Sequence, residues 1–456
     1  MTAAVSEVRM LSASGLLGYG FPEESLRLGL KRGLHMVGVD GGSSDPGPHY
    51  LGSGKCVNSR MAMKRDMALL LKAAMAHKIP MMIGTCGGAG GAPHLKACVD
   101  ILHEIAREEG FHFKLAMIHS EQDKAWINKM RREGRIKPLG SAGPVSEEVI
   151  DRAERIVGLM GPEPYLDALQ SGAQVILAGR STDPAPWAAL AMHHGMPAAN
   201  AWYAGKMLEC GTGAAVPKGH DCQLAAVSRD YVEVEPASLQ RRCTPLSVAI
   251  QALHENASPV AHKEPGGTLD TTECRIGAVS DRAVRISGMK WLPQRYTVKL
   301  EAAQRVGYSA MTIAGTRDPL LIERIDEFLK TVREAVAFKT SGFNVRADDY
   351  RLVFRLYGKN GVMGNWEPES NATPHELGIV VEAVAETQEI ASAVNAIARV
   401  TLLHTDFPGR LCKEGNMAFP FSPSDIERGA IYEFSMRHVV EPDDPLQMFP
   451  IEYESV

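Results

Sequence analysis

Three glycine-rich loops, each placed directly after a short apolar run, constrain the fold of the first half of the chain more than any other feature. The apolar runs are typical of buried strands, and amphipathic segments lie between them. This alternation predicts strand–helix–strand units and a mostly parallel sheet. The predicted strands span residues 36–39, 81–84, 114–118 and 175–178, and the loops span residues 40–55, 84–94 and 179–184.

Two of the intervening helices have clear end signals. One begins at Pro93 and stops at Gly110, as expected when proline opens a helix and glycine closes it. The other is predicted after Ser146, over residues 147–157, with Gly158 as its end.

The pattern changes along the chain, and the change predicts more than one domain. From about residue 220, apolar residues recur with period two, which indicates strands. We therefore predict an α/β fold class with a mostly parallel sheet in an N-terminal domain of residues 1–220. A strand-rich α+β domain would follow over residues 221–345. A small C-terminal α/β appendage of ferredoxin-like type, with a tail, would span residues 346–456.

Charge and hydropathy exclude several partner classes. The 456 residues carry a formal net charge of −5, so no basic surplus is available to bind nucleic acid or an anionic membrane. No apolar stretch approaches the roughly 18 residues of a membrane span, and the N-terminal residues lack a hydrophobic signal core. We therefore expect a cytoplasmic protein. The eight cysteines are scattered without a C-x-x-C pair, which favours free thiols over a zinc ribbon or a disulfide framework.

The three loops are predicted to form a binding site for an anion. The carboxyl ends of parallel strands meet at one edge of a sheet, where ligands bind in open α/β folds. Glycines let backbone N–H groups approach a ligand, and helix N-termini favour negative charge. The alternative is that the loops are only tight turns. The predicted binding residues are Gly41, Gly42, Ser43, Asp45, Lys55, Gly87, Gly88, His94 and Arg180.

Nucleotide fingerprints are incomplete in these loops. Residues 49–55 resemble the end of a P-loop, but His49 replaces its first glycine and Cys56 replaces the final Ser or Thr. The second loop lacks the third glycine of the dinucleotide motif. We therefore expect no nicotinamide or flavin cofactor, and a small acid or acyl thioester fits better than a nucleotide.

Two cations and one acid of the loops have specific candidate roles. Arg180 and Lys55 would anchor an anion, with a surface salt bridge as the alternative. Asp183 precedes Pro184, so it is either a helix N-cap or a catalytic carboxylate.

Histidines in the two longer loops are further candidates. His49 could act as a general acid or base, and His94 could do the same or only form hydrogen bonds. A divalent metal stays open as a cofactor, with Asp45, His49, His94 and Asp183 as its ligands, although no H-E-x-x-H type of spacing supports it.

A compact ionisable cluster lies at residues 206–210. Lys206, Glu209 and Cys210 stand at i, i+3 and i+4, so a helix would place them on one face. Lys206 or Glu209 would move a proton, with Cys210 in support. The alternative is an ordinary ion pair beside a buried cysteine. Secondary candidates are Glu264, Asp270, Lys299 and Glu301.

Several motifs together resemble one known family. GVDGGSSDPGPHYLGSGK, IGTCGGAGGAPHL, LAGRSTDPAPWAAL, KMLECGT and NMAFPFSPSD follow in the order found in the acyclic terpene utilisation (AtuA) family. The resemblance covers residues 38–425. It implies a bacterial cytoplasmic protein associated with catabolism of branched acyclic terpenoids or related acids. Cys86 stands where relatives have Ser or Ala, so the resemblance gives no support for Cys86 as a nucleophile. It also leaves room for a small companion subunit.

These features favour a catabolic enzyme of the lyase or hydratase type that acts on a small branched carboxylic acid or its acyl thioester. One alternative is a hydrolase that uses Cys210 or a metal. Another is a non-catalytic subunit that binds an acyl ligand within a larger complex. We also expect a homo-oligomer.

Overall fold

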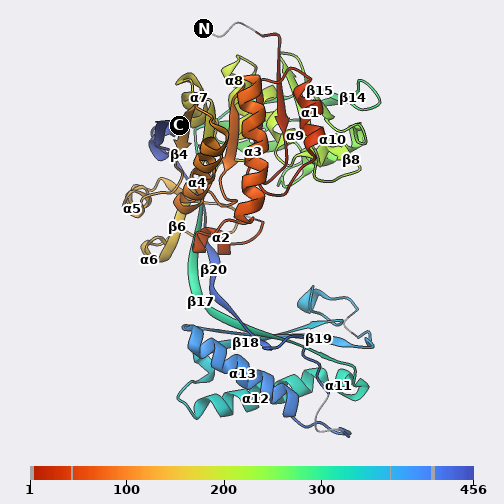
Figure 1. The fold of residues 1–456 in the computed structure, drawn as a ribbon. Helices are drawn as coiled ribbons and strands as arrows, with labels where there is room; N and C mark the ends of the chain where they lie inside the picture. Colours follow the sequence, from red (N-terminus) through yellow and green to blue (C-terminus); the bar gives the residue numbers. More distant parts are fainter. Residues whose placement is uncertain (1–4, 43–44, 370, 412–415) are drawn as a thin grey trace. The chain divides into compact units, whose positions relative to one another are not determined.

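The computed structural model describes residues 5–42, 45–369, 371–411 and 416–456. Its backbone packing divides the chain into two compact units (Figure 1). The first unit comprises residues 1–304 and 434–456, and the second comprises residues 305–433. The chain passes from one unit to the other within β17 (Val298–Thr316) and β20 (Asp425–Val440).

The first unit is built on a ten-stranded sheet whose central strands are parallel. Their order is β1-β2-β3-β7-β4, and every neighbouring pair among them is parallel. This arrangement confirms the predicted mostly parallel sheet. The strands are β1 (Glu7–Ser12), β2 (Met36–Val39), β3 (Met81–Thr85), β4 (Lys114–Ile118) and β7 (Val175–Ala178).

Antiparallel strands extend this sheet on both sides. Beside β1 lie β9, β10, β15 and β14 in that order, and β21 pairs with β4. The segment 221–345 was expected as a separate domain, but it is divided between the two units after residue 304. Its first part belongs to the first unit, where β9 pairs with β1 along its whole length. The added strands are β9 (Gln223–Ser228), β10 (Val232–Pro236), β14 (Arg275–Ala278), β15 (Val284–Ser287) and β21 (Ile451–Ser455).

Helices cover both faces of the sheet, because successive strand residues point to opposite sides. Val37 faces a core formed with α1, α3 and α4, whereas Met36 faces the core that contains α7, α8 and α9. No helix in the described ranges has both the length and the apolar character needed to cross a membrane. The helices are α1 (Glu23–Leu30), α3 (Arg60–His77), α4 (Ala92–Glu109), α7 (Glu163–Gln170), α8 (Ala185–His193) and α9 (Ala198–Leu208).

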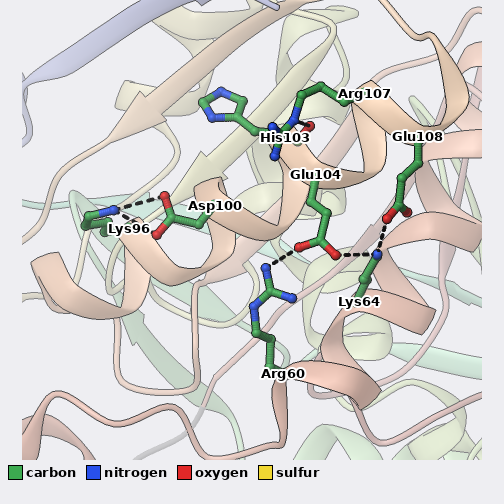
Figure 2. Close-up of polar contacts among 8 residues, drawn as sticks. All are labelled: Arg60, Lys64, Lys96, Asp100, His103, Glu104, Arg107 and Glu108. Atoms are coloured by element: carbon green, nitrogen blue, oxygen red, sulfur yellow. Dashed lines mark hydrogen bonds and ion pairs between the residues drawn. The ribbon is translucent and has the colours of Figure 1, made fainter.

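An ion-pair network ties α3 to α4 on the outer side of one helical layer (Figure 2). Lys64 Nζ lies 2.5 Å from one carboxylate oxygen of Glu104 and 2.6 Å from Glu108. Arg60 pairs with the other Glu104 oxygen. Glu104 on α4 therefore pairs with two cations on α3, Arg60 and Lys64.

One predicted helix is half wrong. Ser146 does cap a helix, α6, but the helix ends at Arg152, and residues 153–158 form strand β6. The physical reason is tertiary, since β6 pairs antiparallel with the start of β17. The apolar residues of this segment suit a buried strand as well as a helix.

Smaller elements complete the first unit. A three-stranded sheet with the order β12-β13-β16 packs against α9, and β8 pairs with β11. These elements are α2 (His49–Ser53), α5 (Lys124–Arg132), β5 (Ile136–Pro138), α6 (Glu147–Arg152), β6 (Ala153–Gly158), β8 (Ala215–Val216), β11 (Arg242–Cys243), α10 (Pro245–Leu253), β12 (Ala261–Glu264), β13 (Gly267–Asp270) and β16 (Lys290–Pro293).

The second unit has the ferredoxin-like arrangement of β-α-β-β-α-β. Its strand order is β18-β19-β17-β20, and α12 and α13 pack on one face over an apolar core. The first strand and helix of this unit precede residue 346, because the β17 portion after residue 304 pairs with β19. The elements are α11 (Pro319–Glu323), α12 (Ile325–Ser341), β18 (Tyr350–Tyr357), β19 (Leu377–Ala385) and α13 (Gln388–His404).

Candidate functional site

The glycine-rich loops of the first unit meet at the carboxyl edge of the parallel sheet. Thr85 N donates to the Asp40 carbonyl at 2.6 Å, and Cys86 N donates to the Ala178 carbonyl at 2.9 Å. These backbone bonds join the ends of β2, β3 and β7. The predicted convergence of the loops is therefore observed.

The glycines of these loops serve close packing between loops. A Cβ added at Gly42 would lie 2.4 Å from Thr85 Cβ, and one at Gly88 would lie 2.4 Å from Val57 Cγ2. Gly41 and Gly87 are similarly crowded, by Thr85 and by Cys56 respectively. These four glycines are not among the lining residues of the cleft described next. Ser43 lies outside the described residues.

A charged cleft of about 650 Å³ lies within the first unit beside these loops. The third loop supplies Arg180 and Asp183 to its lining, and α9 and the residue after it supply Lys206 and Glu209. Glu264, at the end of β12, also lines the cleft. Further lining residues are Asp45, Leu139, Leu159, Lys263, Arg295, Lys299 and Val439.

Arg180 is held by several protein groups at the base of this cleft. Its Nε donates to Glu301 Oε2 at 3.0 Å, and its Nη1 donates to Asp183 Oδ1 at 3.2 Å and to Thr85 Oγ1 at 3.2 Å. Burial opposes the charge, but Glu301 and Asp183 together raise the pKa of the guanidinium. Arg180 is thus a fixed cation with internal carboxylate partners.

Asp183 does not cap a helix, so that interpretation is wrong. The N-cap position of α8 belongs to Pro184, without a side-chain capping bond. The Asp183 carboxylate instead accepts from Arg180 within the same turn. Burial raises the pKa of Asp183 despite this ion pair.

Lys206 and Glu209 form a buried ion pair at the end of α9. The distance from Lys206 Nζ to Glu209 Oε1 is 2.5 Å, and Nζ also donates to the His254 carbonyl at 2.7 Å. Burial opposes the charge of Lys206, but Glu209 raises its pKa. The predicted spacing therefore does bring these two side chains together.

Cys210 is the third member of this predicted cluster. Burial and the negative charge of Glu209 both raise the pKa of this thiol. The thiolate is the nucleophilic form of cysteine, so this environment disfavours nucleophilic attack by Cys210.

Carboxyl groups outnumber cations around the base of the cleft. Burial, followed by the charge of Asp183, raises the pKa of Glu264 to about 8. Burial raises the pKa of Glu209 far above its usual range, and it does the same for Asp40. Asp40 follows β2 and is buried, and one of its carboxylate oxygens has no hydrogen-bond partner. A raised pKa means that each of these carboxyl groups holds its proton more tightly than an exposed carboxyl group does.

The histidines and Lys55 lie apart from the cleft lining. His94 is buried on α4, and its Nε2 donates to the carbonyls of Tyr50 and Lys55, each at 3.1 Å. His49 begins α2, and the Lys55 side chain is exposed. Asp45 alone among the predicted metal ligands of loops one and two lines the cleft.

A metal site is not supported by the described part of the chain. Within it, no group of three or more His, Cys, Asp or Glu residues is arranged to hold a metal ion. The predicted set of Asp45, His49, His94 and Asp183 is therefore not assembled as one site among the described residues.

Asp40 is the residue that sequence reasoning overlooked at this site. Its signal was its position directly after a predicted strand, which places it at the ligand-binding edge of a parallel sheet. Glu264 and Glu301 come from elements 80 or more residues beyond the third loop, so only the fold could bring them to Arg180 and Asp183.

A comparison with protein families identifies this chain. The profile described as acyclic terpene utilisation family protein AtuA matches residues 61–418, which is well over half of the chain. No curated protein and no solved structure matches the chain significantly. The family implies a role in acyclic terpene catabolism. The chain belongs to the acyclic terpene utilisation family.

Proposed function

We propose that the cleft of the first unit carries out general acid–base chemistry of the lyase or hydratase class on a small branched carboxylic acid or its acyl thioester. The observation that supports this proposal best is the group of ionisable side chains around one cleft: Asp183, Lys206, Glu209 and Glu264. Such reactions need one group that takes a proton from the carbon next to a carbonyl. They also need a second group that gives a proton to the hydroxyl oxygen that leaves.

The two roles follow from the environments of the carboxyl groups. Asp183 is held by Arg180, so its carboxylate is the proton acceptor. Glu264, with a pKa of about 8, keeps its proton at neutral pH and is the donor. In a dehydration, Asp183 takes the proton from the carbon next to the carbonyl. The electron pair forms a carbon–carbon double bond, and hydroxide leaves with the proton of Glu264 as water. Lys206, fixed by Glu209, supplies positive charge for the carbonyl oxygen that becomes electron-rich.

The rest of the cleft suits a branched acid. Lys263, Lys299 and Arg295 are among its lining residues and offer charge to a carboxylate or to the phosphates of a thioester carrier. Leu139, Leu159 and Val439 also line the cleft and offer apolar contacts to an aliphatic chain.

The experiment is hydrogen exchange at the carbon next to the carbonyl, which requires only the first half of the reaction. The protein is incubated in D₂O with a panel of branched short-chain acids and their coenzyme A thioesters, and deuterium uptake is measured by mass spectrometry. We expect uptake that is lost in Asp183→Asn. It should persist in Lys55→Met, whose side chain is exposed and outside the cleft lining.

The other outcomes correspond to other functions. Binding of a panel member in calorimetry without any deuterium uptake would favour the non-catalytic ligand-binding subunit and contradict this proposal. Release of free acid from a thioester would favour the hydrolase. We further propose that the protein acts in the cytoplasm, in line with its sequence, and a companion subunit would show as a co-purifying chain needed for uptake.

A further inference from the structure

Helix α10 is apolar on both of its sides. Its nine residues include no charged side chain. Val248 and Ala252 pack into the core of the first unit. On the opposite side, Leu246, Ile250 and Leu253 are 70%, 58% and 52% exposed. Because neighbouring large apolar side chains are normally buried, this outer side lacks a covering surface in the single chain.

The exposed residues form one continuous stripe. Positions i, i+4 and i+7 lie on the same side of a helix, so Leu246, Ile250 and Leu253 are neighbours. α10 packs beside β8 and β14 at one edge of the first unit (Figure 1).

The two ends of the helix carry opposite charges. Exposed Arg242 lies just before α10, and exposed Glu255 lies just after it. In an antiparallel pair of such helices, the basic end of each would lie beside the acidic end of the other. The same pairing would bring Leu246 of one copy to Leu253 of the other, with Ile250 near the two-fold axis.

We propose that α10 is a self-association surface, on which a second copy of this chain packs its own α10 antiparallel about a two-fold axis. The interface is isologous: both copies use Leu246, Ile250 and Leu253, and two symmetric Arg242–Glu255 pairs flank them. The three aliphatic side chains of each copy are fewer than a standard interface of roughly 800 Å² per partner requires, so the polar rim must contribute. Because this interface is small, we expect a dimer whose population depends on protein concentration.

A lipid surface fits this helix less well. Anionic headgroups would attract Arg242 but repel Glu255, and the chain carries a net charge of −5. The antiparallel copy would offer each of these two residues a partner of opposite charge.

The surface is connected to the charged cleft. The His254 carbonyl, directly after α10, accepts from Lys206 Nζ, and Gln251 Nε2 donates to the Lys206 carbonyl at 3.3 Å. Glu255 and Asn256 line the cleft. A second copy on α10 would therefore steady the part of the wall that holds Lys206. The dimer itself does not depend on the proposed reaction.

The first test compares the full chain with Ile250→Arg by sedimentation velocity over a hundredfold range of concentration. We expect a dimer for the unaltered protein and a dissociation constant at least tenfold weaker for Ile250→Arg. The matched control is Phe338→Arg, which replaces an apolar residue that is 81% exposed on helix α12 of the second unit and should leave the dimer unchanged. Circular dichroism would establish that both variants fold.

The second test addresses the antiparallel geometry. Arg242→Glu and Glu255→Arg should each weaken the dimer, and the double variant should restore it. A monomeric unaltered protein throughout the concentration range would overturn the proposal, as would a dimer insensitive to Ile250→Arg or a double variant without recovery. Binding of the unaltered protein to vesicles of anionic phospholipid, lost in Ile250→Arg, would assign the stripe to a membrane surface instead.

Discussion

Arg180 Nε donates to Glu301 Oε2 across 3.0 Å, and both side chains are buried. This bond ties the loop after β7 to β17, and the same guanidinium also holds Asp183. Removal of one partner from a buried ion pair leaves an uncompensated charge in a poorly solvated place. We therefore expect Arg180→Met to lower the free energy of unfolding by about 3–5 kcal/mol, measured by urea denaturation.

Lys299→Met provides the comparison for Arg180. Lys299 Nζ lies 3.3 Å from the other Glu301 oxygen, but its side chain is half exposed. An exposed pair contributes only about 0–1 kcal/mol, so this variant should unfold almost like the unaltered protein. Equal losses for the two variants would show that Arg180 has no special structural role.

The Lys206–Glu209 pair should show unequal costs in a double-mutant cycle. Glu209→Gln leaves a buried ammonium whose remaining partner is the His254 carbonyl, and about 3–5 kcal/mol of stability should be lost. Lys206→Met should cost less, because burial lets Glu209 take up a proton and become neutral. The double variant should lose less than the sum of both. Additive losses in denaturant titrations would contradict coupling of the two residues.

Glu264 should make the protein less stable as pH rises. Its folded pKa is about 8 and its ordinary value is 4.5, so the folded state binds the proton more tightly. The stabilisation is complete below about pH 4.5 and is lost as pH rises through about 8. Glu264→Gln should therefore flatten the fall of melting temperature between pH 5 and 8. A carboxyl carbon of Glu264 that titrates near 4.5 by NMR would refute this assignment.

Glu104 should have the opposite effect at acidic pH. Arg60 and Lys64 lower its pKa from 4.5 to about 2, so the folded state favours the ionised carboxylate. The stabilisation is present above about pH 4.5 and is lost as pH falls toward 2. The melting temperature of Glu104→Gln should lie below that of the unaltered protein at pH 6, and the two should converge near pH 2. Because the network is exposed, high salt should reduce the difference at pH 6.

Cys210 should react slowly with alkylating reagents in the native protein. Burial and Glu209 raise the pKa of its thiol, and only the thiolate attacks iodoacetamide. Peptide mapping after brief labelling at pH 7 should show much less modification of Cys210 in the folded chain than in the urea-unfolded chain. Rapid native labelling would instead support the hydrolase that uses Cys210.

The local sequence pattern by itself determined strands of the parallel sheet and one ion pair of the candidate site. The runs at 36–39, 114–118 and 175–178 coincide with β2, β4 and β7, because short apolar runs between turn residues have few other stable arrangements. The Lys206–Glu209 pair could also be predicted from the sequence, because side chains at positions i and i+3 of a helix lie close together.

Tertiary pairing decided the rest. Residues 153–158 form strand β6 because β17 offers them backbone hydrogen-bond partners. In the same way, β9 belongs to the central sheet because it pairs with β1. Asp183 pairs with Arg180 and does not cap the helix as expected. Arg180 also binds Glu301, which lies 121 residues away in sequence. Periodicity and spacing act over a turn or a strand, whereas an ion pair between distant segments exists only after their elements have packed.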